Sequence, residues 1–275
     1  MSQKDLKVLS LNVFGTPFHP KAIVKTFMRN NVRKRFRLIA EEINRTNADI
    51  LFLQEIIDYP HYIFLLRLLK EYRYKAFKGI FYGPRGGLVI LSKFPLEHTI
   101  YYDFLEKGKL NNKSVTGHLS VRGILLTQLK GTNLWLGNTH LTQNSDDNWS
   151  AGNRFLPLLA SQLTQVAVHT QVILSRKEQL ILAGDFNVPK GSPLYQNFIT
   201  ESTLQDFFTY DDFSTYHQEF LPPGHRVGRL DYILASPSIK LHDTSYILRE
   251  QFTDNLGKKF YASDHIGLVA RCKIA

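Results

Sequence analysis

The sequence predicts an α/β protein in which two packed, mixed β-sheets are flanked by helices. Continuous apolar runs at residues 48–55 and 178–187 are typical of strands that are buried on both faces. Segments with helical spacing of apolar residues accompany these strands in both halves of the chain. Each half shows the order strand, helix, strand, helix and further strands, so helices can cover one face of each sheet.

The first half begins with a predicted strand at residues 7–14. Residues 21–46 are predicted to be helical because apolar residues such as Phe36, Ile39 and Ile43 recur near helical spacing. The strand at 48–55 and a short helix at 61–72 follow. A further strand is predicted at 86–96, and it begins with two glycines.

The second half begins with two predicted strands, at residues 123–130 and 133–141. Gly131 and Thr132 between them favour a hairpin turn. An amphipathic helix at 154–175 leads to the buried strand at 178–187, and strands at 228–236 and 261–270 complete the pattern. No linker or low-complexity segment interrupts the chain, so residues 1–275 are predicted to form a single domain.

Composition and charge limit the classes of function. The single cysteine, Cys272, excludes an intramolecular disulfide and favours a reducing compartment. The chain shows neither an apolar leader after its first residues nor an apolar stretch near 18 residues, so we expect a cytoplasmic protein without a transmembrane segment. Export by another route leaves no mark in the sequence. The net charge of +10 favours polyanionic partners.

Polar residues recur where the apolar strands stop. They are Asn12, Glu55, His140, Asp185, Asn187, Asp231, Asp264 and His265. Each has a structural explanation when taken alone, such as a turn at Asp185 or a solvated strand end at Glu55. Asp231 differs because it lies inside an apolar run, where an unpaired carboxylate is costly. Side chains two apart on a strand share a face, which predicts a shared face for Asn138 with His140, and for Asp185 with Asn187 if that strand runs as far as residue 187.

The segments around these residues resemble the ordered motifs of one superfamily. "LSLNVFG", "LFLQE", "GNTHL", "LAGDFN", "RLDYIL" and "SDHIGL" are similar to those of the endonuclease/exonuclease/phosphatase superfamily, and the match spans residues 7–269. Its members include DNase I-like nucleases, inositol polyphosphate 5-phosphatases and neutral sphingomyelinases. The resemblance implies a four-layer α/β sandwich of the DNase I-like type.

The resemblance also implies roles for the strand-end residues. Glu55 would be the main ligand of a Mg²⁺ ion, for which Mn²⁺ could substitute, with Asn12 beside it and Asp264 supporting the metal side. His265 would be the general base that activates water, and Asp231 would hydrogen-bond its ring. Asp185 and Asn187 would orient the water and a phosphoryl oxygen. His140 would donate to the phosphoryl group or the leaving oxygen.

Further segments are similar to the neutral sphingomyelinase branch. Phe14 and Gly15 match its "LNxWG" opening, and "GPRGGLVILSKFPL" is similar to its next segment. Arg122 replaces the lysine usual before "NTHL", and Arg154 lies on the helix that follows. Both arginines are candidate anion-binding residues. The function expected is a phosphodiesterase that acts on a phospholipid headgroup.

Three alternatives stay open at this stage. A DNase I-like nuclease would take nucleic acid instead of phospholipid. A phosphoinositide phosphomonoesterase is less well matched because "LAGDFNVP" lacks the Tyr-Arg pair of the inositol phosphatases. A non-catalytic binding module would lack a catalytic group, and none is missing. The natural substrate, the number of metal ions and the oligomeric state are not predicted.

The basic run at residues 28–37 has two interpretations. Arg29, Arg33 and Arg37 fall on one helix face, which is either a solvated face or a patch for an anionic membrane surface or nucleic acid. The aromatics at residues 100–110 could likewise meet a membrane or pack on an edge strand.

Overall fold

The computed structural model describes residues 4–15, 32–106, 121–146, 148–150 and 152–274. The first part of the helix predicted at 21–46, including Arg29, therefore lies outside the described residues, as does the end of the aromatic stretch at 100–110.

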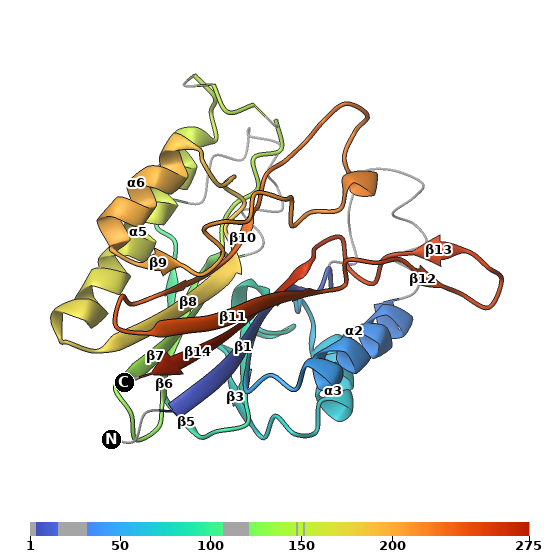
Figure 1. Cartoon of the computed structure of the whole chain (residues 1–275), viewed down its shortest axis with the longest axis horizontal. Helices are drawn as coiled ribbons and strands as arrows, with labels where there is room; N and C mark the ends of the chain where they lie inside the picture. The colour runs from blue at the N-terminus through green and yellow to red at the C-terminus, as the bar shows by residue number, and fades with distance from the viewer. Residues whose placement is uncertain (1–3, 16–31, 107–120, 147, 151, 275) are drawn as a thin grey trace.

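Two six-stranded mixed sheets form the centre of the molecule (Figure 1). The first sheet has the order β11 (Lys240–Ile247), β14 (Gly267–Ile274), β1 (Lys4–Asn12), β2 (Ile50–Gln54), β4 (Val89–Ser92) and β3 (Tyr74–Ala76). The second has the order β5 (Leu96–Asp103), β6 (Gly123–Leu129), β7 (Leu134–His140), β8 (Gln179–Asp185), β10 (Asp231–Ala235) and β9 (Gln205–Asp206). A two-stranded ribbon, β12 (Phe252–Thr253) with β13 (Lys259–Phe260), extends from one end.

The two sheets share one pairing plan. β1 pairs parallel with β2 in the first sheet, and β7 pairs parallel with β8 in the second. Antiparallel neighbours flank both parallel pairs. Because parallel strands end at the same sheet edge, the polar residues that follow them gather there.

Helices cover the outer face of each sheet and complete the predicted four layers. α2 (Val32–Thr46) and α3 (Tyr59–Leu68) share an apolar cluster with the first sheet, in which Phe36, Ile39 and Leu65 are buried. α5 (Leu156–Ser175) and α6 (Pro193–Ser202) share another with the second sheet. A third cluster lies between the sheets, where Val8 and Phe52 belong to the same core as Leu136 and Ile181. The predicted fold class is thus confirmed.

Several boundaries differ from the sequence prediction. α3 begins at Tyr59 because the Asp58 side chain caps it, accepting from His61 N at 2.7 Å. The strand predicted at 86–96 is divided between the two sheets, since β4 ends at Ser92 and β5 starts at Leu96 after Pro95. β14 begins only at Gly267, so Asp264 and His265 lie in the loop before it.

A buried amide pair joins the sheets just behind the gathered strand ends. Gln54 Nε2 donates to Asn138 Oδ1 at 2.7 Å, and Asn138 Nδ2 donates to the Leu53 carbonyl at 2.9 Å. Buried polar groups require such partners, so this pair fixes the first sheet relative to the second. Among the described residues, no helix has the length and apolar character needed to cross a membrane.

We predict that Gly184→Ala destabilises the protein. Gly184 has φ +148°, and a Cβ atom there would lie 2.0 Å from the Thr139 carbonyl oxygen on the neighbouring strand β7. The side chain would force β8 away from β7, so the free energy of unfolding should fall by about 1–3 kcal/mol in urea titrations. Gly152→Ala, where a Cβ atom meets nothing within 4 Å, is the control and should stay within about 0.5 kcal/mol.

Candidate active site

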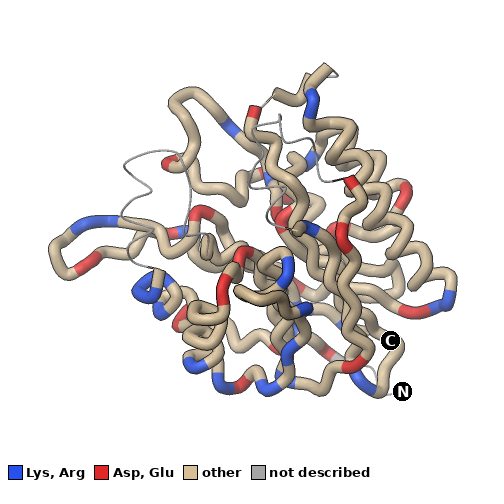
Figure 2. The backbone as a smooth tube through the Cα atoms, turned by 180° about the vertical axis from the view of Figure 1, so that it is seen from behind, with Lys and Arg blue, Asp and Glu red and all other residues tan. Residues whose placement is uncertain are grey.

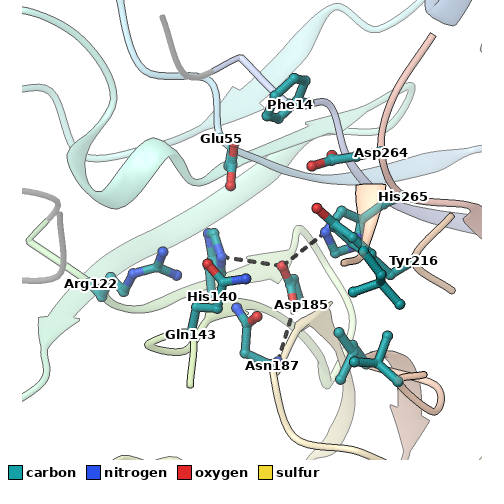
Figure 3. Close-up of a pocket in the computed structure, with 13 residues that line it drawn as sticks. Phe14, Glu55, Arg122, His140, Gln143, Asp185, Asn187, Tyr216, Asp264 and His265 are labelled. Atoms are coloured by element: carbon teal, nitrogen blue, oxygen red, sulfur yellow. Dashed lines mark hydrogen bonds and ion pairs between the residues drawn. The ribbon is translucent and has the colours of Figure 1, made fainter. Parts of the chain in front are cut away.

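A pocket opens where the strands of both sheets end (Figure 3). Most of the residues predicted at strand ends line it, together with residues from later loops. The lining is Phe14, Glu55, Arg122, His140, Gln143, Asp185, Asn187, Tyr216, Leu221, Val227, Leu230, Asp264 and His265.

Asp185 lies at the centre of the polar contacts. Its Oδ2 accepts from Asn12 Nδ2 at 3.0 Å and lies 3.2 Å from His140 Nε2. Asn12 Nδ2 also lies 3.2 Å from Glu55 Oε1, so this amide bridges carboxylates from the two sheets. Burial alone raises the pKa of Asp185, but His265, His140 and the Asn12 hydrogen bond together lower it well below its usual value. Asp185 is therefore a buried anion.

Asp231 and His265 form a buried pair on the other side of Asp185. His265 Nδ1 lies 2.8 Å from Asp231 Oδ2, and His265 Nε2 lies 3.6 Å from Asp185 Oδ2. Burial lowers the pKa of His265, but the Asp231 and Asp185 carboxylates outweigh it and raise the pKa well above 6.5. Burial raises the pKa of Asp231. Because Asp231 holds Nδ1, the Nε2 atom is the one directed at the pocket.

Glu55 and Asp264 present two further carboxylates from the first sheet. Figure 3 shows both pointing into the pocket. Glu55 follows β2 with a positive φ of 61°, a backbone conformation that costs about 1–3 kcal/mol and is typical of functional sites. The loop before β14 places Asp264, and it is tied to β1 because Ser263 Oγ donates to the Asn12 carbonyl at 2.6 Å.

Asn187 lies beyond the end of β8, so the condition for sharing a strand face with Asp185 is not met. β8 ends at Asp185, and Asn187 has a positive φ of 52°, so the two side chains do not share a strand face. Asn187 N donates to Asp185 Oδ1 at 3.0 Å, and its Nδ2 donates to the Leu141 carbonyl at 3.0 Å. By contrast, Asn138 and His140 both lie on β7, where Asn138 meets Gln54 of the first sheet and His140 lines the pocket.

The two candidate anion-binding arginines differ in position. Arg122 lines the pocket, donates to the Leu141 carbonyl, and has a buried Nε without a hydrogen-bond partner among the described residues. Burial lowers the pKa of its guanidinium, whereas the Glu55 and Asp185 carboxylates raise it. Arg154 is not brought to the pocket, because its guanidinium forms two hydrogen bonds, of 2.7 and 2.6 Å, with the Asp146 carboxylate.

Sequence reasoning missed Arg35, which is buried beneath the site. Its guanidinium donates to the carbonyls of Val13 at 3.2 Å, Phe14 at 2.7 Å and Ala262 at 2.8 Å. Burial lowers its pKa to about 10, against the opposing effect of the Asp264 and Glu55 carboxylates. Arg35 therefore joins the loop after β1 to the loop before Asp264. A helical arginine gives no sequence signal for this role, since exposed arginines lie beside it.

Two groups of residues in the site carry cation-ligand chemistry. Asp185, Asp231 and His265 bring ligand atoms within 4.8 Å of one another. These atoms are already engaged in other contacts: His265 with Asp231, and Asp185 with Asn12 and His140. Glu55 and Asp264 instead offer hard oxygen atoms to the pocket, which is the ligand type that Mg²⁺ prefers.

The sequence matches the model of the endonuclease/exonuclease/phosphatase family over residues 9–265. The chain belongs to this family. The matched span contains every candidate site residue described above.

Two curated relatives extend the comparison. A phospholipase C of Staphylococcus aureus is 24% identical over 261 residues, covering 86% of this chain and 75% of the relative. Sphingomyelinase C 2 of Leptospira interrogans is 26% identical over 261 residues, covering 85% of this chain and 40% of the relative.

Solved structures share the fold. Staphylococcus aureus beta toxin, in an F277A, P278A mutant with bound magnesium ions, has a TM-score of 0.67 at 19% identity, covering 97% of this chain and 99% of the other. Truncated Caenorhabditis elegans TDP2 has the same TM-score of 0.67 at 20% identity, covering 98% and 97%. The likeness to both establishes the DNase I-like architecture.

We predict that Arg35→Lys lowers stability although it keeps the charge. A lysine ammonium is a compact point charge and cannot reproduce the planar fork that reaches three carbonyls. Leaving buried carbonyls unpaired should lower the free energy of unfolding by about 1–3 kcal/mol, measured by urea titration. Arg37→Lys on the exposed face of the same helix is the control; an equal loss in both variants would contradict this role for Arg35.

Proposed function

We propose that the protein is a Mg²⁺-dependent phosphodiesterase that hydrolyses the headgroup phosphoester of a phospholipid. The names of its relatives, phospholipase C and sphingomyelinase C 2, support this substrate class. The observation that carries the proposal is the convergence, in one pocket, of a carboxylate-held imidazole, two acceptor carboxylates and a buried guanidinium. These are the groups needed to activate water, hold a cation and bind a phosphoryl anion.

The residues present fit a Mg²⁺ ion at the first-sheet side of the pocket. Glu55 and Asp264 would hold it, and Asn12, which donates to Glu55, would orient that carboxylate. When bound, Mg²⁺ would polarise a phosphoryl oxygen and would supply positive charge that offsets the carboxylates favouring a protonated His265. Mn²⁺ suits the same oxygen ligands.

His265 and Asp231 act on the attacking water. Asp231 holds Nδ1 at 2.8 Å, so Nε2 of the neutral imidazole accepts the proton of the water as it attacks phosphorus. The resulting imidazolium is stabilised by Asp231 and by Asp185, whose Oδ2 lies 3.6 Å from Nε2.

Three residues lie opposite, on the side of the second sheet: His140 ends β7, Asn187 follows β8 and Arg122 precedes β6. His140 is held by Asp185 at 3.2 Å and can donate to a phosphoryl or leaving oxygen. Asn187 lies beside it, and Arg122 adds fixed positive charge within the pocket. Such donors act on the negative charge that grows on the phosphoryl oxygens in the transition state.

We expect Glu55→Gln and His265→Ala each to abolish most hydrolysis while the protein stays folded. Removing the proton acceptor should lower kcat/KM by about 10²- to 10⁴-fold, and removing the Glu55 charge should weaken Mg²⁺ binding. Activity is measured with Mg²⁺ on sphingomyelin micelles, plasmid DNA, phosphoinositides and bis(p-nitrophenyl) phosphate, and circular dichroism checks the fold.

Glu41→Gln and His242→Ala provide matched controls on the exposed surface. Wild-type rates in either site variant would remove its residue from the mechanism. A preference for DNA would support the nuclease alternative, and release of free phosphate from phosphoinositides would support the phosphomonoesterase alternative. Turnover of none of the four would favour a binding module.

We also propose that the exposed face of α2 binds an anionic membrane surface. Arg33 and Arg37 are exposed and lie 5.6 and 5.5 Å from the centroid of the Phe64 ring on α3. Figure 2 shows a cluster of Lys and Arg at the start of α2. The cations are thus held together on one surface, where they can meet lipid phosphates.

Reversing both charges in an Arg33→Glu/Arg37→Glu variant should weaken binding to phosphatidylglycerol vesicles by about tenfold or more, because each cation near such a surface contributes about 1 kcal/mol. Co-sedimentation at increasing salt measures the effect. Arg176→Glu/Lys177→Glu, at the exposed end of α5, makes the same change in net charge. An equal loss in both double variants would indicate a net-charge effect and not a surface on α2.

A further inference from the structure

Thr215 lies where the loop that carries His265 meets the start of β10. Its side chain is fully buried, at 0% exposure, and it is not among the residues that line the pocket. It belongs to none of the sequence motifs. Its contacts nonetheless reach the segments that carry both members of the Asp231–His265 pair.

The Thr215 hydroxyl holds the backbone at the start of β10. Its Oγ1 accepts from Leu230 N at 3.0 Å and from Asp231 N at 3.1 Å. A hydroxyl oxygen has two lone pairs, and these two donors use both of them. Because a buried N–H without a partner is costly, the hydroxyl fixes the position at which Asp231 begins the strand.

The Thr215 backbone holds the loop of His265. Ile266 N donates to the Thr215 carbonyl at 2.8 Å, and Tyr216 forms an isolated antiparallel bridge with His265. One residue therefore contacts two separate segments, through its hydroxyl and through its carbonyl. These segments carry Asp231 and His265, which lie 34 residues apart in the chain.

We propose that Thr215 is a positioning residue that holds the Asp231 carboxylate at hydrogen-bonding distance from the His265 ring. The inference rests on the proposed function, in which Asp231 orients His265 toward the attacking water. Asp231 Oδ2 lies 2.8 Å from His265 Nδ1, so a shift of the backbone at Asp231 would change this contact directly. A displacement of about 1 Å in a catalytic group can lower a rate by about 10²-fold.

The hydroxyl can be separated from the shape of the side chain. Thr215→Val removes the hydroxyl and keeps a similar volume, whereas Thr215→Ser keeps the hydroxyl and loses a methyl group. Thr127→Val is the matched control, because Thr127 is also fully buried and its hydroxyl donates to the Glu97 carbonyl at 2.9 Å, outside the pocket. Circular dichroism checks the fold of each variant. If Thr215→Val does not fold, Thr215→Ala removes the same hydroxyl with a smaller side chain and takes its place.

Steady-state kinetics on bis(p-nitrophenyl) phosphate at saturating Mg²⁺ measure kcat and KM separately. For Thr215→Val we expect kcat to fall by about 10- to 100-fold. KM should stay within about twofold of wild type, because Thr215 does not line the pocket. Thr215→Ser should keep kcat within about threefold of wild type, since both backbone donors retain their acceptor. Thr127→Val should leave both constants unchanged.

A double-mutant cycle with Asp231→Ala tests the route of the effect. If Thr215 acts through Asp231, Thr215→Val should change kcat by less than about twofold in a chain that already carries Asp231→Ala. A general loss of packing would instead lower kcat by the same factor in both backgrounds, and this result would overturn the positioning role.

The remaining outcomes separate this inference from the proposed function. If the wild type is active, Asp231→Ala loses activity and Thr215→Val keeps it, the positioning role is overturned and the proposed function stands. If Thr215→Ser is impaired as strongly as Thr215→Val, the hydroxyl is not the cause and the role is also overturned. A wild type that hydrolyses no phosphodiester with Mg²⁺ would overturn the proposed function, and the positioning role with it.

Discussion

The arrangement of the site depends on one buried negative charge, the Asp185 carboxylate. Burying a carboxylate costs several kcal/mol unless donors surround it. Here the donors come from different elements: Asn12 ends β1 in the first sheet, while His140 ends β7 in the second. Because one sheet cannot satisfy the charge alone, both sheets must end at the same place. The Gln54–Asn138 pair behind them enforces the same alignment in the core.

The site holds two kinds of buried carboxylate, which differ in the donors that surround them. Asp185 is surrounded by donors, and its pKa is lowered. Asp231 is equally buried but faces mainly His265, and burial raises its pKa. The pair can share a proton, whereas Asp185 keeps its charge and draws both imidazoles toward itself. Glu55 and Asp264 lie on the opposite side of the pocket. The residues suited to bind a cation are therefore separate from His265 and Asp231, which are suited to accept a proton.

The sequence allowed the fold class and the strand-end residues to be predicted because both depend on local patterns. Apolar runs mark buried strands, and a carboxylate such as Asp231 inside one of them requires a partner. Arg35 and Thr215 could not be predicted in this way. Their roles come from contacts between segments far apart in the chain, such as Arg35 with Ala262 and Thr215 with Ile266. Arg154 shows the converse case, since Asp146 binds its guanidinium and keeps it from the pocket.

The choice of substrate depends on the part of the pocket that the shared scaffold leaves free to vary. The same TM-score of 0.67 relates this chain to beta toxin and to TDP2, and a shared fold does not by itself fix a substrate. The strand ends supply the polar half of the pocket, where any phosphoester could react. Leu221, Val227 and Leu230 supply an apolar side from the segment after Tyr216. Leu230 is tied to the residue after Asp185, because Phe186 N donates to its carbonyl at 3.0 Å. Leu221 and Val227 lie in the loop itself, so substitutions there can alter substrate preference while the strand ends are retained.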